Sequence, residues 1–191
     1  MARINGSEFG LEPEGLQLIS PGQRPGNSST KPFISPERAT PDMPQSLSKV
    51  LVHLIFSTKH RQPLIGAEIR PRLHAYLIGI LDNLKSPSLQ TGGVADHVHI
   101  LFALGRTLSQ ADLVEEVKKG SSKWMKAEGG VPAFSWQAGY GAFSIGESQV
   151  DAVIDYIQHQ EEHHRKVTFQ EEFRKFLERY QVPYDERYVW D

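Results

Sequence analysis

The sequence contains no cysteine, no excess of basic charge and no long hydrophobic run. The absence of cysteine excludes a disulfide framework, a thiolate metal site and a cysteine nucleophile. The 21 lysines and arginines are balanced by 23 aspartates and glutamates, which excludes a uniformly basic nucleic-acid coat but not a local basic patch. No apolar stretch approaches the ~20 residues that span a bilayer, and the N-terminus lacks a signal-peptide core. We therefore expect a soluble, cytoplasmic protein with no membrane partner.

The first part of the chain shows no periodic apolar pattern. Residues 1–42 contain six of the 12 prolines, together with five glycines and five serines, and this composition predicts a disordered leader. Its GSEF stretch, Gly6–Phe9, matches the translation of two adjacent cloning sites. An origin of the leader in an expression vector is therefore one interpretation, and a native tail that contacts a partner is the other. Met43 is our candidate for the natural start, and residues 43–191 are predicted to form one domain.

From Ser46 onward, apolar residues recur with the spacings of strands and helices. Strands are predicted at residues 49–57, within 86–96, at 97–104 and at 139–146, and helices at 68–84, 109–126, 147–164 and 169–180. The order β-α-β-β-α-β-α indicates an α+β fold. We expect a ferredoxin-like or RRM-like antiparallel sheet with helices packed on one face, followed by C-terminal helices that carry a tyrosine.

Two histidines, His97 and His99, interrupt the apolar strand HVHILFAL. Because side chains alternate along a strand, both histidines share one face and the other face is wholly apolar. The apolar face must pack against the helices, so the histidines are predicted to point off the open side of the sheet, about 6 to 7 Å apart. That separation suits two neutral imidazoles that bind one metal ion, with Asp96 orienting a ring. Taken alone, such histidines are more often structural, hydrogen-bonded groups.

The predicted helix 147–164 carries a tyrosine beside its apolar stripe. The stripe consists of Val150, Val153, Ile154 and Ile157. Tyr156 lies roughly 110° from the centre of that stripe, with Gln160 and His163 on the same flank. Tyr156 can thus present its hydroxyl beside the Gln160 amide, as a nucleophile next to a metal ligand, with His163 as an auxiliary group. The alternative is that the tyrosine ring packs on the sheet edge and leaves its hydroxyl in water.

In combination, these motifs resemble the single-tyrosine HUH transposases of the smallest bacterial insertion sequences. The resemblance rests on DHVHILFAL, on GYGAFS before the tyrosine helix, on a tyrosine with a glutamine four residues later, and on the closing YDERYVWD; it covers about residues 43–191. It implies that His97, His99 and Gln160 bind Mg²⁺ or Mn²⁺ and that Tyr156 is the nucleophile. The implied substrate is single-stranded DNA with hairpin ends, which is cut and rejoined through a 5′-phosphotyrosine. A homodimer is implied as well, with the tyrosine helix acting either in cis or in trans.

Other features leave alternatives open. Lys118, Lys119 and Lys123 are predicted DNA contacts, although lysines on a helix often form only a solvated face. We find no glycine-rich phosphate loop and expect no nucleotide cofactor. A domesticated HUH nickase that processes repeats, a replication-initiator-like endonuclease and a non-catalytic module that binds single-stranded nucleic acid are the competing functions. The remaining histidines carry no predicted role: His53, His60, His74, His159 and His164.

Overall fold

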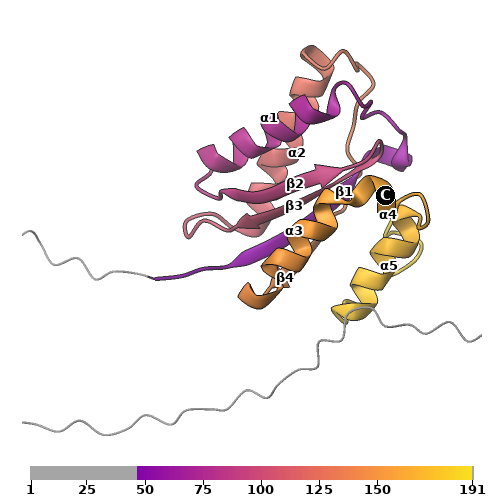
Figure 1. Cartoon of the computed structure of the whole chain (residues 1–191). Helices are drawn as coiled ribbons and strands as arrows, with labels where there is room; N and C mark the ends of the chain where they lie inside the picture. The colour runs from indigo at the N-terminus through magenta and orange to yellow at the C-terminus, as the bar shows by residue number, and fades with distance from the viewer. Residues whose placement is uncertain (1–46, 191) are drawn as a thin grey trace, which may run out of the picture. The chain divides into compact units, whose positions relative to one another are not determined.

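Four antiparallel strands form one sheet in the order β2-β3-β1-β4 in the computed structural model, which describes residues 47–190. The strands are β1 (Leu51–Ser57), β2 (Ser88–Gly93), β3 (His97–Ala103) and β4 (Gly141–Ile145), and the helices are α1 (Arg70–Asn83), α2 (Gln110–Ala127), α3 (Val150–Gln158), α4 (Gln160–His163) and α5 (Phe169–Arg179), with 3₁₀ turns at Lys59–Arg61 and Glu147–Gln149. The predicted leader, residues 1–42, and Met43 lie outside the described residues. Strand order and helix placement confirm the ferredoxin-like fold class (Figure 1).

Helices α1 and α2 cover one face of the sheet (Figure 1). Their buried leucines and valines pack on β1 and β3, whose apolar side chains alternate toward these helices: Val52, Leu54, Phe56, Val98, Ile100 and Phe102. Ser109 caps α2, because its hydroxyl oxygen accepts a hydrogen bond from the Asp112 amide at 3.1 Å. This layer is the main hydrophobic core.

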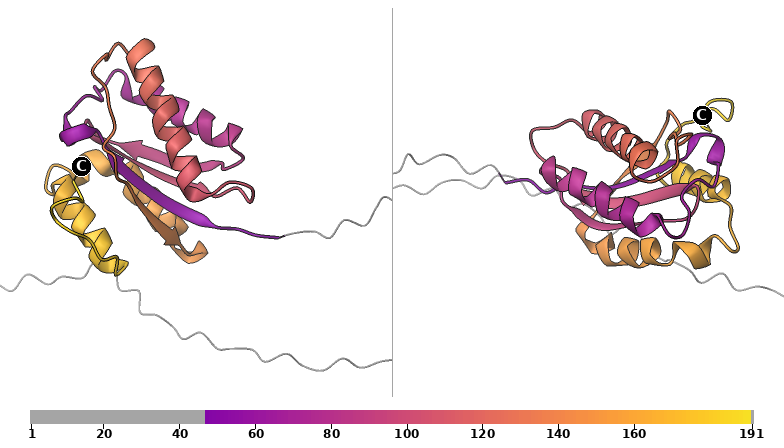
Figure 2. Two further views of the ribbon diagram at one scale, coloured as in Figure 1. Left: turned by 180° about the vertical axis from the view of Figure 1, so that it is seen from behind. Right: turned by 90° about the horizontal axis from the view of Figure 1, so that it is seen from above.

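The opposite face of the sheet, which the strand pattern predicted to be open, is covered by α3, α4 and α5 (Figure 2). Ile157 of α3 packs on Leu51, Leu101 and Ile145, while α5 packs its phenylalanines on Ile55 and Phe143. Two glycines allow this close approach. A Cβ on Gly92 would lie 2.6 Å from the Ile157 carbonyl oxygen, and one on Gly141 would lie 2.5 Å from the Phe173 ring. The second layer therefore buries residues of the sheet that we expected at a surface.

The prediction of one continuous helix over residues 147–164 is wrong in detail, because the helix is interrupted at His159. That residue has φ −98° and ψ 19°, and it separates α3 from the short α4. The apolar stripe ends at Ile157 and every residue from Gln158 to His164 is polar, so burial does not hold a regular helix there. The His159 ring nitrogen Nδ1 also lies 2.8 Å from the Asp155 carbonyl oxygen, at the end of α3.

Along residues 47–190, no helix combines the length and apolar character needed to cross a bilayer.

Candidate active site

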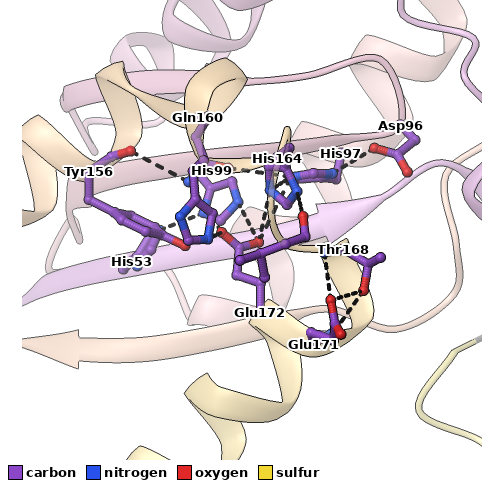
Figure 3. A network of polar contacts seen from close by, with 12 residues as sticks. His53, Asp96, His97, His99, Tyr156, Gln160, His164, Thr168, Glu171 and Glu172 are labelled. Atoms are coloured by element: carbon purple, nitrogen blue, oxygen red, sulfur yellow. Dashed lines mark hydrogen bonds and ion pairs between the residues drawn. The ribbon is translucent and has the colours of Figure 1, made fainter. Parts of the chain in front are cut away.

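The two histidines of β3 lie beneath the α3–α5 layer. Side chains of His97 and His99 are 0% exposed, and their ring centroids are 5.2 Å apart. His97 Nδ1 lies 2.7 Å from a carboxylate oxygen of Asp96, the contact that the sequence predicted. His99 Nδ1 lies 3.0 Å from Nε2 of His53 on β1. Both rings are thus oriented through Nδ1, which directs their Nε2 atoms toward the helices (Figure 3).

The helical layer brings the other predicted residues to the same place. The Tyr156 ring lies 5.8 Å from the His99 ring, measured between centroids. His97 Nε2 lies 3.5 Å from Gln160 Oε1 and 2.9 Å from His164 Nε2. In Figure 3 these side chains point toward one another from β3, α3, α4 and the turn after α4. The structure therefore brings together all four predicted metal and nucleophile residues within one chain.

A glutamate that we did not predict, Glu172, completes the cluster. It lies in the first turn of α5, which begins after a capping box between Thr168 and Glu171. Glu172 is 3% exposed and lies on the apolar face of this helix, between Phe169 and Phe173. A carboxylate at such a position needs polar partners, because an unpaired buried charge is strongly destabilising.

Glu172 finds those partners in the histidine and tyrosine cluster. Its Oε2 lies 3.4 Å from His99 Nε2 and 3.3 Å from His164 Nε2. Its Oε1 accepts hydrogen bonds from the Tyr156 hydroxyl and, at 3.2 Å, from the Gln160 amide nitrogen. The carboxylate consequently contacts groups from β3, α3, α4 and the following turn (Figure 3).

Burial and mutual charge set the protonation of the cluster. Burial lowers the pKa of His99 and that of His53, which favours neutral imidazoles at pH 7. Burial alone would raise the pKa of Glu172, but the surrounding histidines, His99 first, hold it well below its usual range. Burial, followed by the Glu172 charge, raises the pKa of the Tyr156 hydroxyl above its ordinary value. The site thus holds an ionised Glu172 carboxylate and a protonated Tyr156 hydroxyl beside the neutral imidazoles of His53 and His99.

The donor atoms present fit a divalent metal ion. Among the described residues, His97, His99, His164 and Glu172 each offer one ligand atom, and these atoms all lie within 4.8 Å of one another. His99 Nε2 and Glu172 Oε2 are buried without a hydrogen-bond partner. Leaving such an atom unsatisfied costs about 1 to 3 kcal/mol, and a cation between them would satisfy both. Imidazole nitrogens and carboxylate oxygens are ordinary ligands of transition-metal ions.

Four side chains in or near the cluster, those of three histidines and one glutamate, had no predicted metal role. His163, predicted as an auxiliary group, has its ring 5.3 Å from the ring of Tyr156. His53 and His164 had no predicted role, although His53 alternates onto the same sheet face as the β3 histidines. Glu172 could have been found from its sequence position, because it interrupts an apolar stripe of α5.

The predicted DNA-binding lysines lie on α2, in the helical layer on the other face of the sheet from the histidines (Figure 1). Lys118 donates hydrogen bonds to the Ala138 and Gly139 carbonyl oxygens at 3.0 and 2.9 Å, and burial lowers its pKa to about 8. It also lines a groove of about 500 Å³. Lys119 and Lys123 are exposed. The structure therefore gives Lys118 a local structural contact and leaves the other two ammonium groups facing solvent.

Comparisons with known proteins give one family and several similar structures, of which two are described here. The model of the family described as "Transposase IS200 like" matches residues 46–160. A proposed transposase from Deinococcus radiodurans R1 is 21% identical over 60% of this chain and 93% of its own, with a TM-score of 0.49. A REP-associated tyrosine transposase bound to a REP hairpin is 15% identical over 66% of this chain and 75% of its own, also with a TM-score of 0.49. Among curated proteins, no sequence matches this chain significantly.

Proposed function

Because the chain belongs to the family of IS200-like transposases, we propose that it is a DNA transposase that cleaves and rejoins single-stranded DNA at insertion-sequence ends through a 5′-phosphotyrosine. In this proposal His97, His99 and Gln160 hold Mg²⁺ or Mn²⁺, and Tyr156 is the nucleophile. The observation that supports it is the convergence of the Tyr156 hydroxyl and the histidine Nε2 atoms on one buried cluster. Residues 43–191 would form the transposase domain.

The nucleophile needs help, because a tyrosine hydroxyl has an ordinary pKa of ~10 and burial raises the pKa of Tyr156 further. In the proposed step the Tyr156 O–H bond breaks, the tyrosine oxygen bonds to phosphorus, and the bond from phosphorus to the 3′ oxygen breaks. The Glu172 carboxylate already accepts the hydrogen bond of this hydroxyl and so orients it. The leaving 3′ oxygen takes up a proton and becomes a free 3′-hydroxyl. A bound divalent cation would withdraw charge from the scissile phosphate and align it for attack.

Rejoining requires no external energy source in this scheme. One phosphodiester bond is exchanged for another, so a 3′-hydroxyl from a second cut can attack the tyrosyl phosphate, displace the tyrosine oxygen and return a proton to it. The proposed substrate is single-stranded DNA with hairpin ends, and the exposed Lys119 and Lys123 of α2 are proposed to contact its phosphates.

We also propose a homodimer, since two strands must be cut and exchanged and each chain carries one such tyrosine. Tyr156 lies against the histidines of its own chain, which supports action in cis within each subunit. Light scattering of the purified protein tests this assembly directly. A monomer that still cuts and rejoins both ends would remove the homodimer from the proposal.

The decisive experiment for the reaction is a search for the covalent intermediate. Purified protein is incubated with Mn²⁺ and labelled single-stranded oligonucleotides from the flanks of its own gene, and the products are resolved on a denaturing gel. We expect a metal-dependent adduct that is lost in Tyr156→Phe and kept in Tyr188→Phe, a matched change at an exposed tyrosine. Folded wild-type protein that forms no adduct on any flank would contradict the proposed activity.

A further inference from the structure

The position of Glu172 poses a physical problem within α5. Its neighbours on the buried face of that helix are Phe169, Phe173 and Leu177, and the helix packs against the apolar part of the sheet. Burying a carboxylate among such residues costs several kcal/mol unless it is paired or coordinates a metal. The ion-pair contacts of Glu172 in the structure are made with imidazoles, those of His97, His99, His163 and His164.

The second unassigned member of the cluster, His164, is fixed in the same direction. Its Nδ1 lies 2.8 Å from the Val167 carbonyl oxygen, which turns its Nε2 toward Glu172 and His97. This is the arrangement that metal-binding histidines adopt, in which one ring nitrogen bonds a carbonyl and the other faces the ion. His97 is held in the same way by Asp96, and His99 by His53.

We propose that Glu172 and His164 are further ligands of the metal that His97, His99 and Gln160 bind, so that the site has three histidines and one carboxylate besides the Gln160 amide. This inference rests on the proposed function for the presence of a metal, and it extends the site past residue 160, where the family match ends. Gln160 keeps its proposed place at the metal through Oε1, which lies 3.5 Å from His97 Nε2, while its amide nitrogen donates to the Glu172 carboxylate. The ligand atoms come from β3, from the turn after α4 and from α5, so a bound ion fastens the C-terminal helix to the sheet.

Two consequences follow from this ligand set. Three imidazoles favour Mn²⁺, Co²⁺ or Zn²⁺, whereas Mg²⁺ prefers oxygen ligands and several waters. The protein should therefore bind Mn²⁺ much more tightly than Mg²⁺. Because α5 supplies a ligand, metal binding should also stabilise the folded chain against heat, even when no DNA is present.

The test measures metal binding by the full-length chain without DNA. Mn²⁺ is titrated into metal-free protein, and bound ion is followed by calorimetry and by loss of the free Mn²⁺ signal in electron paramagnetic resonance. We expect Glu172→Gln and His164→Gln each to weaken Mn²⁺ binding about tenfold or more. The matched controls Glu178→Gln on α5 and His159→Gln beside α4 change exposed side chains of the same types and should bind as the wild type does.

Thermal unfolding provides a second readout. Mn²⁺ at a hundredfold excess over its dissociation constant should raise the wild-type Tm by about 5 to 10 °C. The rise should be much smaller in the two ligand variants at the same concentration, and Mg²⁺ should produce little shift in any of them. Circular dichroism tests whether each variant folds. If Glu172→Gln does not fold, the Mn²⁺ affinity of His164→Gln tests the proposed ligand set instead.

Wild-type Mn²⁺ affinity in folded Glu172→Gln or His164→Gln would overturn the inference and leave Glu172 as a hydrogen-bonding partner of Tyr156 and Gln160 only. This failure is distinct from failure of the proposed reaction. If the protein forms the Tyr156 adduct but its Mn²⁺ affinity does not depend on Glu172, only the extended metal site is refuted. If Mn²⁺ binding depends on Glu172 but the protein forms no adduct, only the proposed transposase reaction is refuted.

Discussion

Gly92 of β2 lies where α3 crosses the sheet, and replacing it with alanine should displace the nucleophile. A Cβ at this position would lie 2.6 Å from the carbonyl oxygen of Ile157 and 2.7 Å from its Cγ2 atom. Ordinary contacts of a Cβ begin at 3.4 Å, so α3 must retreat by about 0.8 Å. Such overpacking typically costs about 1 to 3 kcal/mol of unfolding free energy. Tyr156 immediately precedes Ile157, and a shift of about 1 Å at a reacting group can slow a reaction by about a hundredfold.

Two measurements separate these effects. Urea denaturation gives the loss of stability of Gly92→Ala, and the rate of adduct formation under conditions where the variant is folded gives the loss of activity. Gly79→Ala is the matched control, because a Cβ there meets nothing within 4 Å and the residue lies in α1. That change should stabilise the protein by about 0.5 to 1 kcal/mol and leave the rate unchanged. A Gly92→Ala protein with wild-type stability and rate would show that α3 does not pack against β2 as described.

Three further predictions concern other parts of the molecule. Burial, followed by the charge of Arg70, lowers the pKa of His74 to about 4, while the unfolded chain binds this proton near pH 6.5. The contribution of His74 to the free energy of unfolding is therefore fully present above pH 6.5 and is lost as the pH falls toward 4. Between pH 7 and pH 5, urea denaturation should show that His74→Gln loses about 1 to 2 kcal/mol less unfolding free energy than the wild type does. Equal losses in the two proteins would contradict this prediction. Ser121→Ala should cost about 1 to 3 kcal/mol in the same assay, because the hydroxyl accepts the buried Trp136 indole N–H at 2.9 Å, whereas Ser122→Ala should cost little. Lys119→Ala should reduce the salt slope of DNA binding by about 1, as measured by fluorescence anisotropy, and an unchanged slope would remove this lysine from the DNA interface.

The fold could be predicted from the sequence because its central strands obey a simple alternation. Val52, Leu54 and Phe56 share one face of β1 and pack against α1 and α2, as the spacing indicates. The same alternation places His97 and His99 on the opposite face, which is where the structure has them. These inferences need only local backbone geometry, so they survive without knowledge of tertiary contacts.

The break at His159 and the covered sheet face depend on tertiary contacts and could not be predicted in the same way. Residues 158–164 are all polar, so they carry no apolar stripe whose interruption would mark a helix end. The sequence pattern is therefore the same whether or not the helix is interrupted at His159. Burial of the histidine face depends on α5 folding back onto Ile55 and Phe143. The distance in sequence between β1 and α5 leaves no local signal of that contact.

Even so, the polar members of the buried site share a property that the sequence does show. His53 stands between the apolar residues Leu51 and Ile55 on one face of β1, and Glu172 stands between Phe169 and Phe173 on an otherwise apolar face of α5. A polar residue inside an apolar stripe must find a partner, because burial without one is too costly. When two buried apolar stripes each contain a polar residue, the two polar residues find hydrogen-bond partners most readily by facing the same polar cluster. The polar interruptions in β1 and α5 therefore indicate from sequence that α5 packs against the histidine-bearing face of the sheet, whereas the distances that make the group a metal site come only from the tertiary structure.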